Sequence, residues 1–439
     1  MVWLKEKVLK HPLFKASLVY TITDAINKGI PFVLLPLLTF YLTPADFGIT
    51  ANYNIFVNIL TVFVSLSING AFSVSYFKIS KNEAAVYLSS MLVLIFISFI
   101  IFSIIIFLFS GGVREILPIA TIYIVAGALV SLGQSVTAIN LDLWRLQGQA
   151  FKFGLYEISQ GLFAVVVSLI LLIGLRMKWE SRVIASVITA CSFGILSLLM
   201  INKQGYLTRR ISWSAMKDAL AYGLPLLPYS LGVWLRFGID RVYITKFCGQ
   251  SETGVYATSL QFGLLISFLT LALNNAFSPY LFKMLSNDDE QALQSQKLKL
   301  VKFTYIYFVL LAFIGIAFTL LSRFLIEYFL SEKFITAEKF IPVVIASQVV
   351  QGMCLMLSLY ILFVKKTARL TIITAACGVF QLFISYYAVK NYGSLGGAYA
   401  SLCTNAVNLI AVWFYSAKIY PMPWNLSKKQ TTSLTKPLI

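Results

Sequence analysis

The chain has 439 residues, of which 59% are hydrophobic and only 12% are charged. This composition lies far outside the range of soluble domains, so we expect a membrane protein. The formal net charge of +18 would suit a nucleic-acid binder, but basic residues in cytoplasmic loops explain it better, and we expect no nucleic-acid partner.

Apolar runs long enough to cross a bilayer recur along the chain, and they lack the period-two alternation of barrel strands. In the first half we predict spans near 14–41, 50–77, 85–109, 116–140, 153–175 and 183–202. In the second half we predict spans near 219–247, 255–282, 301–322, 340–363, 370–389 and 394–416. The predicted fold is therefore all-α, with about twelve transmembrane helices.

Two stretches occur twice, which indicates homologous halves. NGAFSVSYFK (69–78) returns as NNAFSPYLFK (274–283), and DFGITA (46–51) returns as ETGVYA (252–257). The repeat joins the second span to the eighth, and an even shift keeps the orientation, so we predict parallel six-helix repeats. The predicted domains are an N-terminal bundle at 1–205, a cytoplasmic connector at 206–218, a C-terminal bundle at 219–417 and a cytoplasmic tail at 418–439.

Basic residues in the loops predict the orientation of the chain. If the N-terminus is cytoplasmic, Lys and Arg on the cytoplasmic side outnumber those on the other side more than twofold, so both termini are predicted to be cytoplasmic. The outward side is then assigned Arg114, Arg176, Lys178, Arg182, Lys246, Arg323, Lys333, Lys339 and Lys390.

Enzyme motifs are missing from the sequence. The single histidine, His11, precedes the first span, and the chain has no GxxxxGK[ST] phosphate loop. We therefore expect no enzyme and no cofactor. A membrane polysaccharide polymerase is the enzyme alternative, but it would be expected to carry a large external loop.

Ionisable residues inside the spans are the candidate functional residues, because such groups are costly in lipid and normally face a bundle interior or a watery cavity. They are Asp24 and Lys28 in span one, Glu157 in span five, and Arg236, Asp240 and Arg241 in span seven. The alternative is that the acid and the base four residues apart in spans one and seven neutralise each other and merely pack.

Prolines occur in the two spans that open the halves. Span one contains Pro31 and Pro36, and span seven contains Pro225 and Pro228. Proline removes a backbone hydrogen bond and kinks a helix, which suits a bending element in a transporter. Static curvature is the alternative interpretation.

Two longer segments carry a family resemblance. They are GIPFVLLPLLTFYLTPADFGITANY (29–53) and YGLPLLPYSLGVWLRFGIDRVYITKFCGQSETGVYATS (222–259). Their sharpest elements are P-x-D-[FY]-G, ending at Gly48, and D-R-x-x-I, ending at Ile244. These segments resemble the half-signatures of the O-antigen (Wzx-type) flippases, polysaccharide transporters of the multidrug/oligosaccharidyl-lipid/polysaccharide exporter superfamily.

The resemblance implies two six-helix bundles around a central cavity in a bacterial inner membrane. It implies alternating access that carries a polyprenyl-pyrophosphate-linked oligosaccharide, such as an O-antigen unit for lipopolysaccharide, from the inner to the outer leaflet. The lipid tail would stay among membrane lipids. Contact with the polysaccharide polymerase machinery is a further implied partnership.

An anionic pyrophosphate needs cationic partners, so we assign substrate binding to Lys28, Arg236 and Arg241. Without a nucleotide site, the sequence is equally compatible with coupling to H⁺ or Na⁺ through Asp24, Asp240 or Glu157 and with passive flipping drawn by consumption of the cargo outside. A multidrug or cation antiporter of the same superfamily is the main transport alternative. Its cationic cargo would favour a cavity rich in carboxylates.

Overall fold

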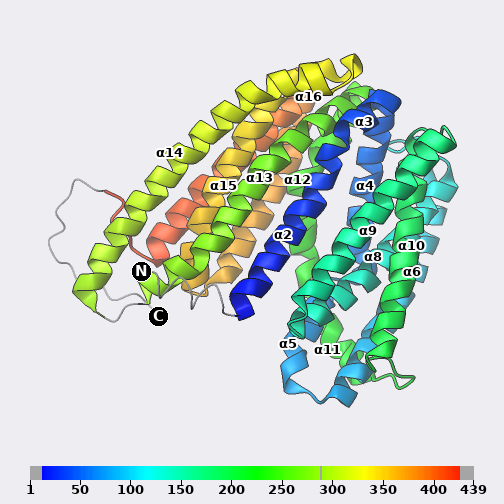
Figure 1. Cartoon of the computed structure of the whole chain (residues 1–439), viewed down its shortest axis with the longest axis horizontal. Helices are drawn as coiled ribbons and strands as arrows, with labels where there is room; N and C mark the ends of the chain where they lie inside the picture. Colours follow the sequence, from blue (N-terminus) through cyan, green and yellow to red (C-terminus); the bar gives the residue numbers. More distant parts are fainter. Residues whose placement is uncertain (1–11, 287–288, 426–439) are drawn as a thin grey trace. The chain divides into compact units, whose positions relative to one another are not determined.

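The computed structural model describes residues 12–286 and 289–425 (Figure 1). Within these ranges the regular structure is entirely helical, and ten helices are long and apolar enough to cross a membrane. Among them, α16 (Thr367–Ile419) contains two predicted spans, because its backbone breaks at Gly393 with φ 66°. The charged helix α12 (Leu227–Cys248) supplies one more span-length helix. The all-α prediction with about twelve spans is confirmed.

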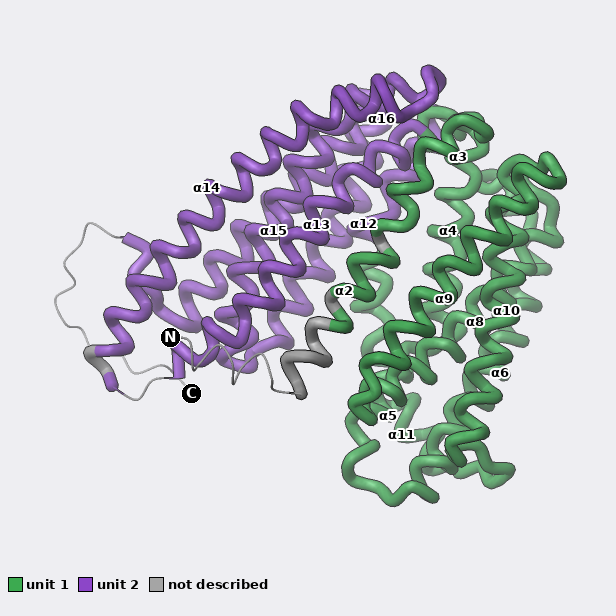
Figure 2. The backbone as a smooth tube through the Cα atoms, viewed as in Figure 1, with its two compact units in different colours: residues 1–234, 249–254 green, residues 235–248, 255–439 purple. Residues whose placement is uncertain are grey.

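Contacts divide the described chain into two compact units (Figure 2). Unit 1 runs to Trp234 and also takes Gly249–Gly254, whereas unit 2 consists of Leu235–Cys248 and the chain from Val255 onward. The chain therefore passes from unit 1 to unit 2 within α12. The domain limits predicted above were drawn by counting spans, and they stay a prediction.

Unit 1 is organised around α8, which packs against α4, α6 and α10. Close approach depends on small residues: a Cβ atom at Gly133 of α8 would lie only 2.2 Å from the Ala190 carbonyl oxygen of α10. The helices of unit 1 are α2 (Pro12–Val33), α3 (Leu35–Tyr41), α4 (Pro44–Ser65), α5 (Asn69–Ser75), η1 (Tyr76–Lys78), α6 (Lys81–Leu108), α7 (Ser110–Arg114), α8 (Thr121–Leu146), α9 (Ala150–Leu169), η2 (Ile170–Gly174), α10 (Trp179–Lys203), α11 (Trp213–Gly223) and η3 (Leu224–Leu226).

Unit 2 continues from α12 through α13 (Gln250–Leu285), α14 (Glu290–Phe329), η4 (Glu332–Lys339), α15 (Ile341–Phe363) and α16. Fully buried Ile244 of α12 lies in a core cluster with residues from α13, η4, α15 and α16. Because residues four apart share a helix face, Asp240 is directed toward the same interior as Ile244.

Span one is divided where proline predicted a kink. α2 ends at Val33 and α3 begins at Leu35, with Pro36 in its first turn. Pro36 has no N–H for the helical ladder, so the regular helix is interrupted at Leu34. Pro31 stays inside α2.

The polar connector predicted at 206–218 is anchored on α6. The Oγ atoms of Ser89 and Ser90 accept hydrogen bonds of 2.9 Å from the backbone N–H groups of Thr208 and Ser212. The Ser212 side chain also accepts a bond from the N–H of Ala215 and so caps α11. The connector thus belongs to unit 1.

The repeated stretch at 69–78 and 274–283 adopts two local conformations. In the first half, Leu66 and Ser67 have φ 51° and separate α4 from α5. The Ser65 side chain accepts the N–H of Ser67 at 3.3 Å, a local bond that competes with the helical ladder. Alanine, a strong helix former, replaces Ser67 in the second half, where α13 is continuous.

The other repeated element forms a reciprocal contact inside unit 1. In the repeat, Pro44 corresponds to Gln250 and Gly48 corresponds to Gly254. A Cβ atom at Gly48 would lie 1.9 Å from the Gln250 carbonyl oxygen, and one at Gly254 would lie 1.7 Å from that of Pro44. Each glycine therefore abuts the equivalent backbone of the other copy, as in a two-fold interface. We call this the glycine crossing.

Candidate functional site

A polar ladder runs along α12 and the second half of α16 within unit 2. On both helices the contacting residues are four apart, which puts each set on one helix face. The ladder pairs Gly397 with Ile244, Ser401 with Asp240, and Asn405 with Arg236. The absence of a side chain at Gly397 lets the helices approach, because a Cβ atom there would lie 2.9 Å from Ile244 Cδ1.

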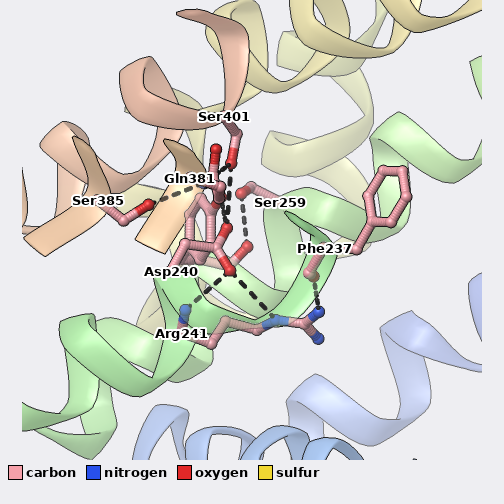
Figure 3. A network of polar contacts seen from close by, with 8 residues as sticks. Phe237, Asp240, Arg241, Ser259, Gln381, Ser385 and Ser401 are labelled. Carbon is pink, nitrogen blue, oxygen red and sulfur yellow. Dashed lines mark hydrogen bonds and ion pairs between the residues drawn. The ribbon is translucent and has the colours of Figure 1, made fainter. Parts of the chain in front are cut away.

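Asp240 is the carboxylate at the middle of the ladder, and it is only 3% exposed (Figure 3). It accepts hydrogen bonds from the Tyr256 hydroxyl at 2.5 Å and from Ser401 Oγ at 3.3 Å. The backbone N–H of Arg241 donates to it at 2.9 Å, and Arg241 Nε lies 4.0 Å from the same carboxylate. A buried carboxylate is tolerated here because hydroxyls and a guanidinium surround it.

The network continues from Ser401 to the first half of α16 (Figure 3). Gln381, which is fully buried, donates through Nε2 to Ser385 Oγ at 2.8 Å and to Ser401 Oγ at 3.2 Å. The Tyr256 hydroxyl of α13 and the Ser401 hydroxyl of α16 thus both lie within hydrogen-bond distance of the Asp240 carboxylate of α12. Oxygen donors of this kind suit a proton or a hard cation.

Arg236 lies one helical turn before Asp240 and is 5% exposed. Its Nη2 atom donates to the amide oxygens of Gln351 on α15 and Asn405 on α16, the latter at 2.7 Å. Asn405 in turn donates to Ser347 Oγ at 2.7 Å. The guanidinium therefore holds α12, α15 and α16 together.

The contacts of Arg236 and Asp240 extend beyond the mutual pair that the alternative interpretation assumes. Asp240 pairs with its chain neighbour Arg241, while Arg236 bonds to the amides of Gln351 and Asn405. Both side chains also have hydrogen-bond partners on other helices. Arg241 remains 22% exposed and donates to the Phe237 carbonyl oxygen at 2.6 Å.

The other predicted residues lie in unit 1, on α2 and α9. Asp24 is half-buried on α2, and the side chain of Lys28 lies outside the described part of the structure. On α9, Gly154 and Gly161 abut Thr23 and Asn27 of α2. Glu157 lies between the two glycines and shares their helix face, so it is on the α2-facing side of α9.

Sequence reasoning missed the neutral partners of the ladder. Gln351, Ser401 and Asn405 carry no charge and lie within apolar spans, so a search for charges passed over them. A usable signal was present, since Gly397, Ser401 and Asn405 recur every four residues and mark one face of a helix.

Comparisons with known proteins agree with this fold. Residues 13–285 match the model of a family described as polysaccharide biosynthesis protein. A protein of the Lsg locus of Haemophilus influenzae is 26% identical over 296 residues, covering 66% of this chain and 71% of that protein.

Two solved structures share the fold. An inward-facing multidrug resistance MATE family transporter of the MOP superfamily has a TM-score of 0.70 at 15% identity, covering 91% of this chain and 94% of its own. The lipid II flippase MurJ, in an inward closed conformation, has a TM-score of 0.66 at 15% identity, covering 92% of this chain and 87% of its own. The chain is thus a multi-pass membrane protein with the fold of MOP superfamily transporters.

Proposed function

This chain belongs to the polysaccharide biosynthesis protein family, and on that premise we propose that it is a flippase for a lipid-linked oligosaccharide. The cargo would be a surface polysaccharide unit, such as O-antigen, on polyprenyl pyrophosphate. It would move from the inner to the outer leaflet of a bacterial inner membrane, with both termini of the protein cytoplasmic.

The observation that carries the proposal is this family membership, and the charge of span seven supports it. Arg236 is held by amide oxygens, and Asp240 offers one carboxylate to the neighbouring Arg241. A helix that keeps an excess of guanidinium charge suits an anionic cargo. Arg241, the more exposed of the two arginines, is the better candidate for direct contact with the pyrophosphate, while Arg236 would support it. Lys28 is retained as a third cationic contact.

Deletion of the gene in its host should make a lipid-linked glycan accumulate on the cytoplasmic leaflet. The variant Arg241→Gln should then restore export at least tenfold less well than the wild type at equal protein levels. Export would be followed by surface labelling of the glycan. The matched control is Lys246→Gln, which removes an exposed charge from the same helix and should export normally.

Full export by Arg241→Gln would contradict the role of this residue in cargo binding. A deletion that changes sensitivity to cationic drugs and leaves the lipid-linked glycan undisturbed would instead support the antiporter alternative. Export by Arg241→Gln therefore tests the role of Arg241, whereas glycan accumulation in the deletion strain tests the flippase function.

Ion coupling is proposed through Asp240, because hydroxyl and amide groups surround its carboxylate. In proteoliposomes loaded with the accumulated glycolipid, an imposed H⁺ or Na⁺ gradient should accelerate flipping by the wild type. Asp240→Asn should abolish this acceleration and leave the slow, gradient-independent rate. If Asp240→Asn responds to the gradient as the wild type does, Asp240 is not the coupling residue. Asp24→Asn and Glu157→Gln would then test the other two predicted carboxylates.

A further inference from the structure

A second polar feature lies wholly inside unit 1. α2, α3, α4, α9 and α10 enclose a cavity of about 240 Å³. Its wall is mainly apolar, and its polar side chains include Asn27, Asn54, Ser168 and Arg182. A volume of this size holds several waters or a group as large as a phosphate.

Arg182 is the only charged residue that lines the cavity in the described part of the chain. The sequence placed it in an outward loop, but α10 begins earlier than predicted, at Trp179, and includes Arg182 in its first turns. Its side chain lines the cavity, and the residue is half-buried.

The guanidinium of Arg182 forms no hydrogen bond or ion pair with any residue that the structure describes. An uncompensated charge inside a membrane protein is costly, so such groups normally find a carboxylate, water or a ligand. Because no carboxylate among the described residues lines this cavity, the positive charge of Arg182 is available to a ligand.

Buried polar atoms at the cavity that have no internal hydrogen bond over the described residues include Asn27 Oδ1 and Ser168 Oγ. An amide oxygen can accept a bond from a sugar hydroxyl, while a serine hydroxyl can donate to a phosphate or carboxylate oxygen. A cation beside unused polar atoms in an apolar wall is a combination that fits an oxyanion on a polyhydroxylated molecule.

We propose that Arg182 and this cavity form an oxyanion subsite in unit 1. Resting on the flippase function proposed above, the subsite takes a phosphate or a sugar carboxylate of the cargo. With cytoplasmic termini, the N-terminal end of α10 and the C-terminal end of α2 both lie toward the outer leaflet. The subsite therefore acts late in transport, when the cargo head reaches the outward side.

Binding of inorganic pyrophosphate and of glucuronate to the purified full-length protein, followed by calorimetry, tests the subsite and distinguishes the two sources of the oxyanion. We expect the wild type to bind at least one of them. Arg182→Gln should weaken that binding at least tenfold, and Arg182→Lys should weaken it less. The matched control is Arg176→Gln, which removes an exposed positive charge shortly before α10 and should bind as the wild type does.

A second variant, Ala164→Leu, fills part of the cavity wall without changing charge, and it should also weaken binding. The subsite is wrong if the wild type binds neither anion, or if Arg182→Gln binds as well as Arg176→Gln. Either result can coexist with glycan accumulation in the deletion strain, so failure of the subsite is distinguishable from failure of the flippase function. Loss of binding together with intact unfolding temperatures would establish a direct contact.

Discussion

Gly254→Ala is expected to destabilise the folded protein by about 3 kcal/mol, at the upper end of the usual cost of overpacking. The added Cβ would lie 1.7 Å from the Pro44 carbonyl oxygen and 2.8 Å from the Gly48 nitrogen, so helix backbones and not flexible side chains would have to move. Thermal unfolding of the purified protein in detergent measures the effect.

Gly48→Ala is the reciprocal change at the glycine crossing and should have a similar cost, since its Cβ would lie 1.9 Å from the Gln250 carbonyl oxygen. The control is Gly29→Ala in α2, where no atom lies within 4 Å of the added methyl group. Equal stability of the three variants would show that the two backbones do not cross closely at these glycines.

Arg236→Met is expected to be the second large change. It leaves the oxygens of Gln351 and Asn405 without their buried donor, and each such loss costs about 1–3 kcal/mol. The sum, about 2–6 kcal/mol, should lower the unfolding midpoint well below that of the wild type. Lysine should rescue only in part, because it lacks the planar fork with which a guanidinium reaches two amides.

A double-mutant cycle can separate this contact from a general loss of packing. Gln351→Leu removes one acceptor, so Arg236→Met should cost less in that background than in the wild type. We expect a coupling of at least about 1 kcal/mol between the two positions. Strictly additive effects would mean that the hydrogen bond between Arg236 and Gln351 contributes nothing to stability.

The fold was predictable because its dominant signals are local. Long apolar runs predict membrane helices, and Pro36 predicted the interruption that the structure has at Leu34. The break at Leu66 and Ser67 was not predictable from the repeat, because the matching residues, Leu271 and Ala272, lie inside the continuous helix α13. There, a serine hydrogen bond and the surrounding packing decide between two conformations of similar local preference.

The candidate site was predictable only in part. Arg236, Asp240 and Arg241 are conspicuous charges in an apolar span, but the neutral partners Gln351, Asn405 and Ser401 lie more than 100 positions away in the chain. No local sequence pattern predicts that the side-chain amides of Gln351 and Asn405 bind Arg236. Arg182 was assigned to a loop because hydropathy marks the apolar stretch and does not mark the turn that precedes it.

The glycine crossing also bears on how such a chain arose. If a half-length ancestor had paired with a second copy, every residue at the two-fold contact would have appeared twice, and a substitution good for one side would have been imposed on the other. Joining the copies in one gene removes that constraint. Pro44 now begins α4, whereas its counterpart Gln250 donates to the Ile116 carbonyl at 2.8 Å and accepts from Asn52 at 3.1 Å. Under this origin, gene fusion allows the two sides of a symmetric contact to form different interactions, while both halves still have the glycine that permits the close approach.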